Sequence, residues 1–125
     1  MQNKYTIYKM SIYGHYAQQY YGNKVEFPKE SFLIAGISFY QDNCEEINYG
    51  IELNMVPEPN NEHDNTAVSI LFNDKIIGYV PKEPEYYKKL CNENITEPLK
   101  IINIKKIKGN YGIRVIPKCF FNEGM

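Results

Sequence analysis

Short strand patterns that follow one another closely are the feature that most constrains the fold of this chain. Apolar and polar residues alternate in most of them, with the two-residue period of a half-buried strand. These patterns occupy 50–56, 67–72, 75–80, 99–108 and 112–117. Asn73-Asp74 and Gly109-Asn110 separate two neighbouring pairs and predict tight hairpin turns. Many short strands with such turns favour a small barrel or sandwich.

Two further elements complete the expected fold. Residues 31–40 are apolar nearly throughout and predict a buried strand, in which Gly36 indicates a bend or a close backbone approach. One helix is expected to open at Pro81 with acidic residues beside it and to end near Asn92. We expect Tyr86, Tyr87 and Leu90 to face the core. Lys88 and Lys89 are expected to stay in water. We therefore predict a mainly β fold with one or two short helices.

The first thirty residues are rich in tyrosine and fit no single period. Their spacing suits a helix face as well as an alternating strand, and Gly14 and Gly22 interrupt both patterns. The tyrosines could cover one edge of the core, or they could form a stacking platform for bases. Pro28 is expected to close this arm.

Composition places the chain among single-domain globular proteins. It has 125 residues, 43% of them hydrophobic, and a net charge of −1. The charge is uneven, because residues 1–62 hold four lysines and eight acidic residues, whereas 63–125 hold ten basic and seven acidic residues. Any surface that faces phosphates should therefore draw on the second half. Three widely spaced cysteines, no signal-peptide pattern and no apolar run of about 20 residues lead us to expect a cytoplasmic protein.

The sequence offers little chemistry for catalysis or cofactor binding. It contains neither a G-x-x-x-x-G-K-[ST] loop nor a G-x-G-x-x-G motif, the cradles that nucleotide phosphates need. Its two histidines, His15 and His63, and its scattered cysteines form no recognisable zinc set. We expect no enzyme, no cofactor and no metal site.

One edge of the expected sheet carries groups suited to binding single-stranded nucleic acid. Aromatic faces, amides, a carboxylate and a lysine are the usual means of holding such a strand. They lie on one loop and at the ends of two strands: Asn61, His63 and Asp64, with Phe39, Tyr40, Tyr79 and Lys82. The alternative is that Phe39 and Tyr79 belong to the core and that Asp64 only caps a turn.

Three segments resemble the HIRAN domain family and occur in the family's order. Ile34–Tyr40 is similar to its V-x-G-x-x-[FY]-Y strand, Glu58–Val68 to its [ED]-P-x-N-x-x-D-x-N-A-[VI] loop, and Ile77–Glu83 to its [IV]-G-[YH]-[VI]-[PK] strand. The resemblance implies a small OB-like β-barrel of about six strands. In the family this domain is fused to Swi/Snf-class remodelling helicases and to nucleases, and it also occurs as a stand-alone protein.

The resemblance also implies a binding mode. In the helicase-like transcription factor members the domain captures the free 3′ end of single-stranded DNA. By motif position, Asp64 would accept a hydrogen bond from the terminal 3′-OH, Asn61 would contact the terminal nucleotide and His63 would stack on a base. The phosphate path would be lined by the remaining positions: Phe39, Tyr79 and Lys82.

Two positions depart from the DNA-binding members. Ser38 stands where they commonly have a basic residue, and His63 where they commonly have Tyr. Losing one phosphate contact should weaken binding and flatten its salt dependence. Three lysines late in the chain could offset that loss if they face the strand: Lys105, Lys106 and Lys108.

We expect three parts: a Tyr-rich arm over 1–30 that packs on or flanks the barrel, a HIRAN-like barrel over 31–118 and a tail over 119–125. The expected function is a non-enzymatic module that captures the free 3′ end of single-stranded DNA, with DNA-processing proteins as further partners and no membrane contact. The alternative is a protein-interaction module that keeps the fold and has lost DNA binding. A metal-dependent nuclease would need clustered carboxylates, of which the sequence supplies only a loose set.

Overall fold

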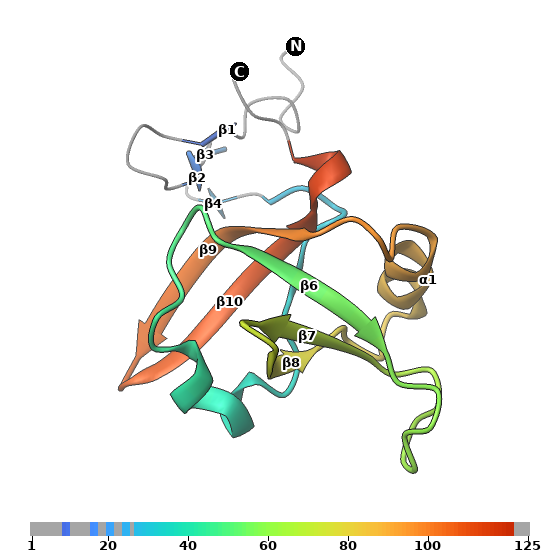
Figure 1. The fold of residues 1–125 in the computed structure, drawn as a ribbon. Coiled ribbons are helices and arrows are strands. Elements are labelled where there is room, and N and C mark those ends of the chain that lie inside the picture. Colours follow the sequence, from blue (N-terminus) through green and yellow to red (C-terminus); the bar gives the residue numbers. More distant parts are fainter. Residues whose placement is uncertain (1–8, 11–15, 18–19, 22–23, 26, 122–125) are drawn as a thin grey trace.

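The centre of the structure is a curled sheet of six antiparallel strands, shown in Figure 1. In this computed structural model the described residues are 9–10, 16–17, 20–21, 24–25 and 27–121. In spatial order the strands are β5 (Phe32–Leu33), β10 (Asn110–Pro117), β9 (Leu99–Ile107), β6 (Glu52–Pro57), β7 (Val68–Phe72) and β8 (Lys75–Tyr79). The predicted mainly β fold of about six strands is confirmed.

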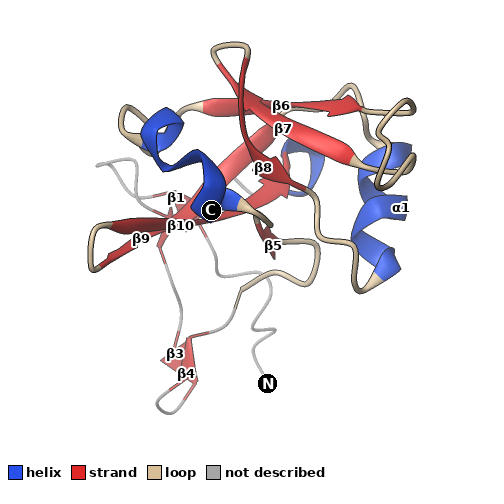
Figure 2. Ribbon diagram, turned by 90° about the horizontal axis from the view of Figure 1, so that it is seen from below, coloured by secondary structure: helices blue, strands red, loops and turns tan. Residues whose placement is uncertain are grey.

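The sheet curls into a half-barrel, and the chain just after β5 meets the opposite edge strand, β8, at one bridge. Ala35, just after β5, exchanges two backbone hydrogen bonds with Tyr79 of β8, at 2.8 and 2.9 Å. Figure 2 shows the strongly curled sheet from below. At this bridge the backbone groups of the two edges pair with each other and are not left exposed.

Short helices complete the fold. The 3-10 helix η2 (Ile37–Cys44) follows the closing strand, α1 (Glu85–Glu93) follows β8, and η3 (Lys118–Phe120) follows β10. Two pairs of two-residue strands precede the barrel in sequence: β1 (Lys9–Met10) with β2 (Tyr16–Ala17), and β3 (Tyr20–Tyr21) with β4 (Lys24–Val25). The rest of the tyrosine-rich arm and the end of the tail lie outside the described residues, so the expected division at residues 30 and 118 stays a prediction.

The core fills the inside of the half-barrel, as the alternating patterns predict. In β6, for example, Leu53 and Met55 are buried while Glu52 and Asn54 are exposed. Aliphatic side chains from the long strands β9 and β10 join them, and Tyr87 of α1 packs on Phe32 at a ring-centroid distance of 5.2 Å. Burial of this apolar surface, at about 25 cal/mol per Å², is the main force that holds the sheet curled.

One predicted hairpin turn is confirmed and the other was one residue out of place. Asn73 and Asp74 both have positive φ and join β7 to β8, as a primed two-residue turn requires. Between β9 and β10 the turn residues are Lys108 and Gly109, with φ values of 52° and 83°. Glycine takes the second central position there, so Asn110 is free to pair with Ile107.

The long buried strand predicted for residues 31–40 is wrong beyond Ala35. Gly36 adopts a left-handed conformation with φ of 70°, and the chain then enters η2. The predicted bend at Gly36 is confirmed, but the apolar residues after it follow a helical turn, which leaves Phe39 85% exposed. A run of apolar letters cannot tell a strand from a helix, since both can bury them.

The expected division of the helix was also partly wrong. The helix begins at Glu85, after Pro84, and buries Lys88 together with Leu90 and Cys91. Tyr86, expected to face inward, is exposed. The inward face therefore includes Lys88, whose side chain meets Asp64 of the loop described next.

Candidate nucleic-acid interface

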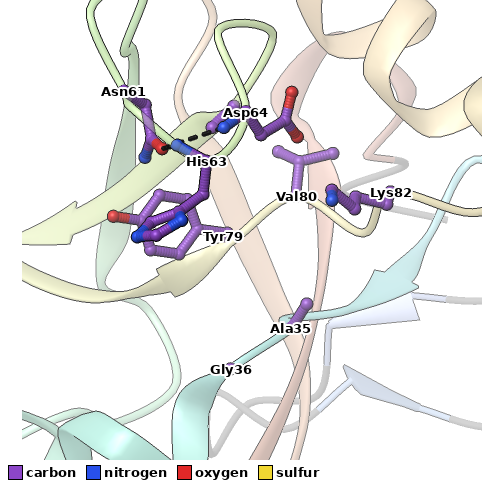
Figure 3. Close-up of a pocket in the computed structure, with 9 residues that line it drawn as sticks. Ala35, Gly36, Asn61, His63, Asp64, Tyr79, Val80 and Lys82 are labelled. Carbon is purple, nitrogen blue, oxygen red and sulfur yellow. Dashed lines mark hydrogen bonds between the residues drawn. The ribbon is translucent and has the colours of Figure 1, made fainter.

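The candidate site is built on the loop between β6 and β7, at the lower right of Figure 1. Backbone hydrogen bonds close it at its base, where the N–H of Glu58 donates to the carbonyl of Ala67 at 2.8 Å. The side-chain oxygen of Asn61 accepts from the backbone N–H groups of His63 (2.9 Å) and Asp64 (3.0 Å), as drawn in Figure 3. An Asn side chain that caps its own loop in this way fixes the following residues.

The Asn61 amide therefore holds the loop together from both ends. Its nitrogen donates to the carboxylate of Glu58 at 2.9 Å, while its oxygen serves the backbone as described. The oxygen uses both of its lone pairs in its two bonds to the backbone, so one amide hydrogen remains to donate to a ligand. The role predicted for Asn61, contact with a bound nucleotide, thus comes in addition to a structural role that the loop sequence itself indicates.

Asp64 forms an ion pair with Lys88 of α1, and further hydrogen bonds hold both side chains in place. One of its oxygens accepts from Nζ of Lys88 at 2.6 Å, and the other accepts from the backbone N–H of Thr66 at 2.9 Å. The Lys88 side chain is 10% exposed and that of Asp64 is 17% exposed. Lys88 also donates to the Thr66 hydroxyl at 2.7 Å. The hydrogen bonds from Lys88 and then Thr66 hold the pKa of Asp64 well below its usual range.

Tyr79 joins the loop to the strand that closes the barrel. Its hydroxyl donates to the carboxylate of Glu58, with oxygen–oxygen distances of 3.1 and 3.2 Å. Burial, together with the negative charge and hydrogen bond of Glu58, raises the pKa of Tyr79 to about 12. Tyr40 also raises the pKa of Tyr79, by its charge and its hydrogen bond. Helix η2 therefore contacts the site through Tyr40.

These residues surround a cleft of about 380 Å³, which we call the end cleft. Loop residues form one wall, the end of β8 the other, and Ala35 and Gly36 the floor, as Figure 3 shows. The full lining is Ala35, Gly36, Asn61, His63, Asp64, Ala67, Tyr79, Val80 and Lys82. His63 and Lys82 are exposed, and the volume lies at the lower end of the range of small-molecule pockets.

The end cleft brings together five of the eight predicted site residues: Asn61, His63, Asp64, Tyr79 and Lys82. The other three lie on η2. All three line a separate pocket; Ser38 and Phe39 are exposed there, while Tyr40 is half-buried and reaches Tyr79. The grouping of the eight into one phosphate path therefore stays a prediction.

Sequence reasoning missed Lys88 as part of the site and placed it in solvent. Lys88 lies three residues before the buried Cys91, so the two share a face of α1. The sequence did hold a signal for this residue. It places a lysine on the apolar face of a short helix and an acidic loop elsewhere in the chain that could pair with it. The pairing itself depends on how the helix docks.

Charges in the end cleft nearly cancel. Lys88 balances Asp64, and Glu58 lies on the same edge as Lys82, which makes no ion pair with another described residue. Among the residues that the structure describes, no group of three His, Cys, Asp or Glu could hold a metal ion. No described helix is long and apolar enough to cross a bilayer.

We expect the Asp64–Lys88 pair to make stability depend on pH in acid. Because the folded pKa of Asp64 is depressed, its stabilising effect is present above the unfolded value of about 4 and is lost as pH falls toward the folded value. The difference in Tm between the wild type and Asp64→Asn should be constant between about pH 5 and 7 and should shrink below about pH 4. A difference that stays constant through the acid range would mean that the carboxylate charge contributes nothing to stability.

Comparison with known proteins gives one family. The HIRAN domain model matches residues 31–105, which include the floor of the end cleft, the loop, β8 and Lys88. The comparison detects no catalytic domain in the chain. No curated protein and no solved structure matches it. A matched segment that spans most of the 125 residues, and that contains the whole end cleft, identifies this chain as a member of the HIRAN domain family.

Proposed function

We propose that this protein is a non-enzymatic module that binds the free 3′ end of single-stranded DNA in the end cleft. The observation that carries the proposal is the convergence of Asn61, His63, Asp64, Tyr79 and Lys82 on one cleft. They come from a loop, a strand end and the segment that follows it, and membership of the HIRAN family supports the same ligand.

The chemistry of the cleft suits a terminal nucleotide. An ionised Asp64 can accept the hydrogen of a terminal 3′-OH on a lone pair that Lys88 and Thr66 leave unused. The exposed imidazole of His63 offers a face on which a base can stack, and Lys82 offers a cation for the adjacent phosphate. One stacked base contributes only about 1–3 kcal/mol, and Lys82 is the one lysine that lines the cleft, so binding should be weak. We expect short oligonucleotides to bind with dissociation constants on the order of micromolar.

Fluorescence polarisation with short oligonucleotides tests the proposal. We expect an oligonucleotide with a free 3′-OH to bind more tightly than one blocked by a 3′-phosphate, and His63→Ala to weaken binding by about tenfold through the lost stacking. The Tm of His63→Ala should be unchanged, because the side chain is exposed. Asn65→Ala is the matched control: Asn65 is exposed in the same loop and does not line the cleft. Equal binding of 3′- and 5′-accessible strands would contradict end capture.

A protein-interaction module is the second candidate. Apolar residues form much of the end cleft, its charges nearly cancel, and the neighbouring Phe39 is 85% exposed. An exposed aromatic beside a neutral apolar cleft is typical of a surface that binds a protein partner. In that case Phe39→Ala would abolish the partner interaction, and the wild type would bind no oligonucleotide with an end preference.

A further inference from the structure

A second cleft, of about 530 Å³, opens over β5, β9 and β10. Its cations and amides are Lys105, Lys108, Arg114, Asn103 and Asn110, and no Asp or Glu is found among its described lining residues. We call this set the basic groove. It concentrates positive charge from the second half of the chain on one surface, whereas the charges of the end cleft nearly cancel.

The basic groove lies on the outer face of the half-barrel. Ile104 and Ile113 pack with the inner core, and they alternate along their strands with the groove residues Asn103, Lys105 and Arg114. Lys105 and Lys108 are exposed and make no ion pair with another described residue. The groove cations are therefore available to a ligand outside the barrel.

Arg114 lines this groove, and two contacts restrain its side chain. Its guanidinium donates to the hydroxyl of Ser31 at 3.2 Å and lies 4.7 Å from the centre of the Phe27 ring. A guanidinium fixed in this way loses less side-chain freedom when it binds a phosphate than an unrestrained one would. Two aliphatic side chains beside the cations remain exposed, Leu33 by 53% and Ile107 by 64%.

One extended segment, β5 and the two residues after it, lines both clefts. Ile34 donates its backbone N–H to Ile113 on one side, and Ala35 donates to Tyr79 on the other, as expected for an extended segment between two neighbours. Phe32 and Ile34 point into the core, so Leu33 and Ala35 point outward on one face. Leu33 lines the basic groove and Ala35 the end cleft, two residues or about 7 Å apart along the strand.

We propose that the basic groove is the path of a single-stranded nucleic acid whose end occupies the end cleft. The strand crosses Leu33, its phosphates meet Arg114, Lys105 and Lys108, and its sugars and bases contact the exposed aliphatic side chains. This inference rests on the proposed function for the direction of the strand. The positive charge of the groove and its continuity with the end cleft support a nucleic-acid path independently of that direction.

Oligonucleotide length separates the two sites. Thymidine oligonucleotides of about three and about twelve nucleotides, each with a free 3′-OH, report on the end cleft alone and on both sites, respectively. In Lys105→Gln/Lys108→Gln the longer strand should bind about tenfold more weakly, and its log–log salt slope should fall by about 1.4, or about 0.7 for each lost phosphate contact. The affinity of the shorter strand should change less than about twofold, since it extends past Leu33 but not to Lys105 and Lys108, which lie beyond β10.

Lys106→Gln is the matched control. Lys106 is exposed on the same strand, but it lies over the Tyr111 ring at 4.9 Å from the centroid and does not line the groove. An equal loss of affinity in this variant would contradict the proposed path along the basic groove but not 3′-end capture. Equal affinities of the wild type for the shorter and the longer oligonucleotide would do the same. If the groove variants weaken binding but a 3′-phosphate makes no difference, end capture fails and the groove stands.

Polyglutamate distinguishes a nucleic acid from an acidic protein segment. We expect polyglutamate of matched charge to displace the longer oligonucleotide far less well than the unlabelled oligonucleotide does. Equal displacement would show that the groove accepts any polyanion and would overturn a nucleic-acid path. Absence of binding by both oligonucleotides at low salt would overturn the groove and the proposed function together.

Discussion

Gly78→Ala is expected to destabilise the fold by about 1–3 kcal/mol and to lower Tm by roughly 5–15 °C. Gly78 lies in β8 where the sheet closes, and a Cβ added there would meet the side chain of Ile34 inside contact distance and the carbonyl oxygen of Ala35 at 2.7 Å. Ile34 is buried and the Ala35 backbone is hydrogen-bonded to Tyr79, so neither can move away without loss. Thermal unfolding followed by circular dichroism measures the effect.

The same substitution should weaken end binding, because it displaces Tyr79 and the floor of the end cleft. Gly112→Ala is the matched control for Tm, since a Cβ at Gly112 meets nothing within 4 Å and Gly112 also lies in a strand. About 1 kcal/mol shifts Tm by several degrees in a domain of this size. A Tm for Gly78→Ala within about 1 °C of that for Gly112→Ala would therefore mean that Ile34 and the Ala35 backbone can shift to admit the extra carbon without loss of stability.

Asp64→Asn is expected to reverse the preference of the site for strand ends. In the wild type the negative charge of Asp64 disfavours a 3′-phosphate, although Lys88 at 2.6 Å reduces that repulsion. Replacing the carboxylate by an amide leaves the cation of Lys88 without its partner beside the cleft. We expect 3′-phosphate strands then to bind more tightly than 3′-OH strands, a change in the affinity ratio on the order of tenfold or more.

Lys88→Met supplies the opposite change. It removes the cation and leaves Asp64 charged, so discrimination against a 3′-phosphate should increase. Circular dichroism should first establish that each variant is folded at the assay temperature. Shifts of the ratio in the same direction for both variants would indicate general damage to the loop, and an unchanged ratio in both would mean that the strand end does not lie beside Asp64.

Several features could be predicted from the sequence because they depend on neighbours along the chain. Alternation in 50–56 places Leu53 and Met55 inside, since successive strand residues face opposite sides. Asn73-Asp74 specifies its turn through a local tolerance of positive φ. The three motif segments indicate the family because their residues and spacing can be read directly from the chain, and the family match confirms it.

Tertiary structure decided what depends on contacts between distant residues. Lys88 was expected in water, yet it is buried because Asp64, 24 residues earlier, offers a carboxylate at 2.6 Å. The face taken by Lys105 relative to Lys106 depends on which side of β9 meets the core. The sequence by itself thus determined most of the strands, one turn and the loop that carries the candidate site. Docking of α1 and closure of the sheet determined which charges meet, because a charge is stabilised only by the partner that the folded chain brings beside it.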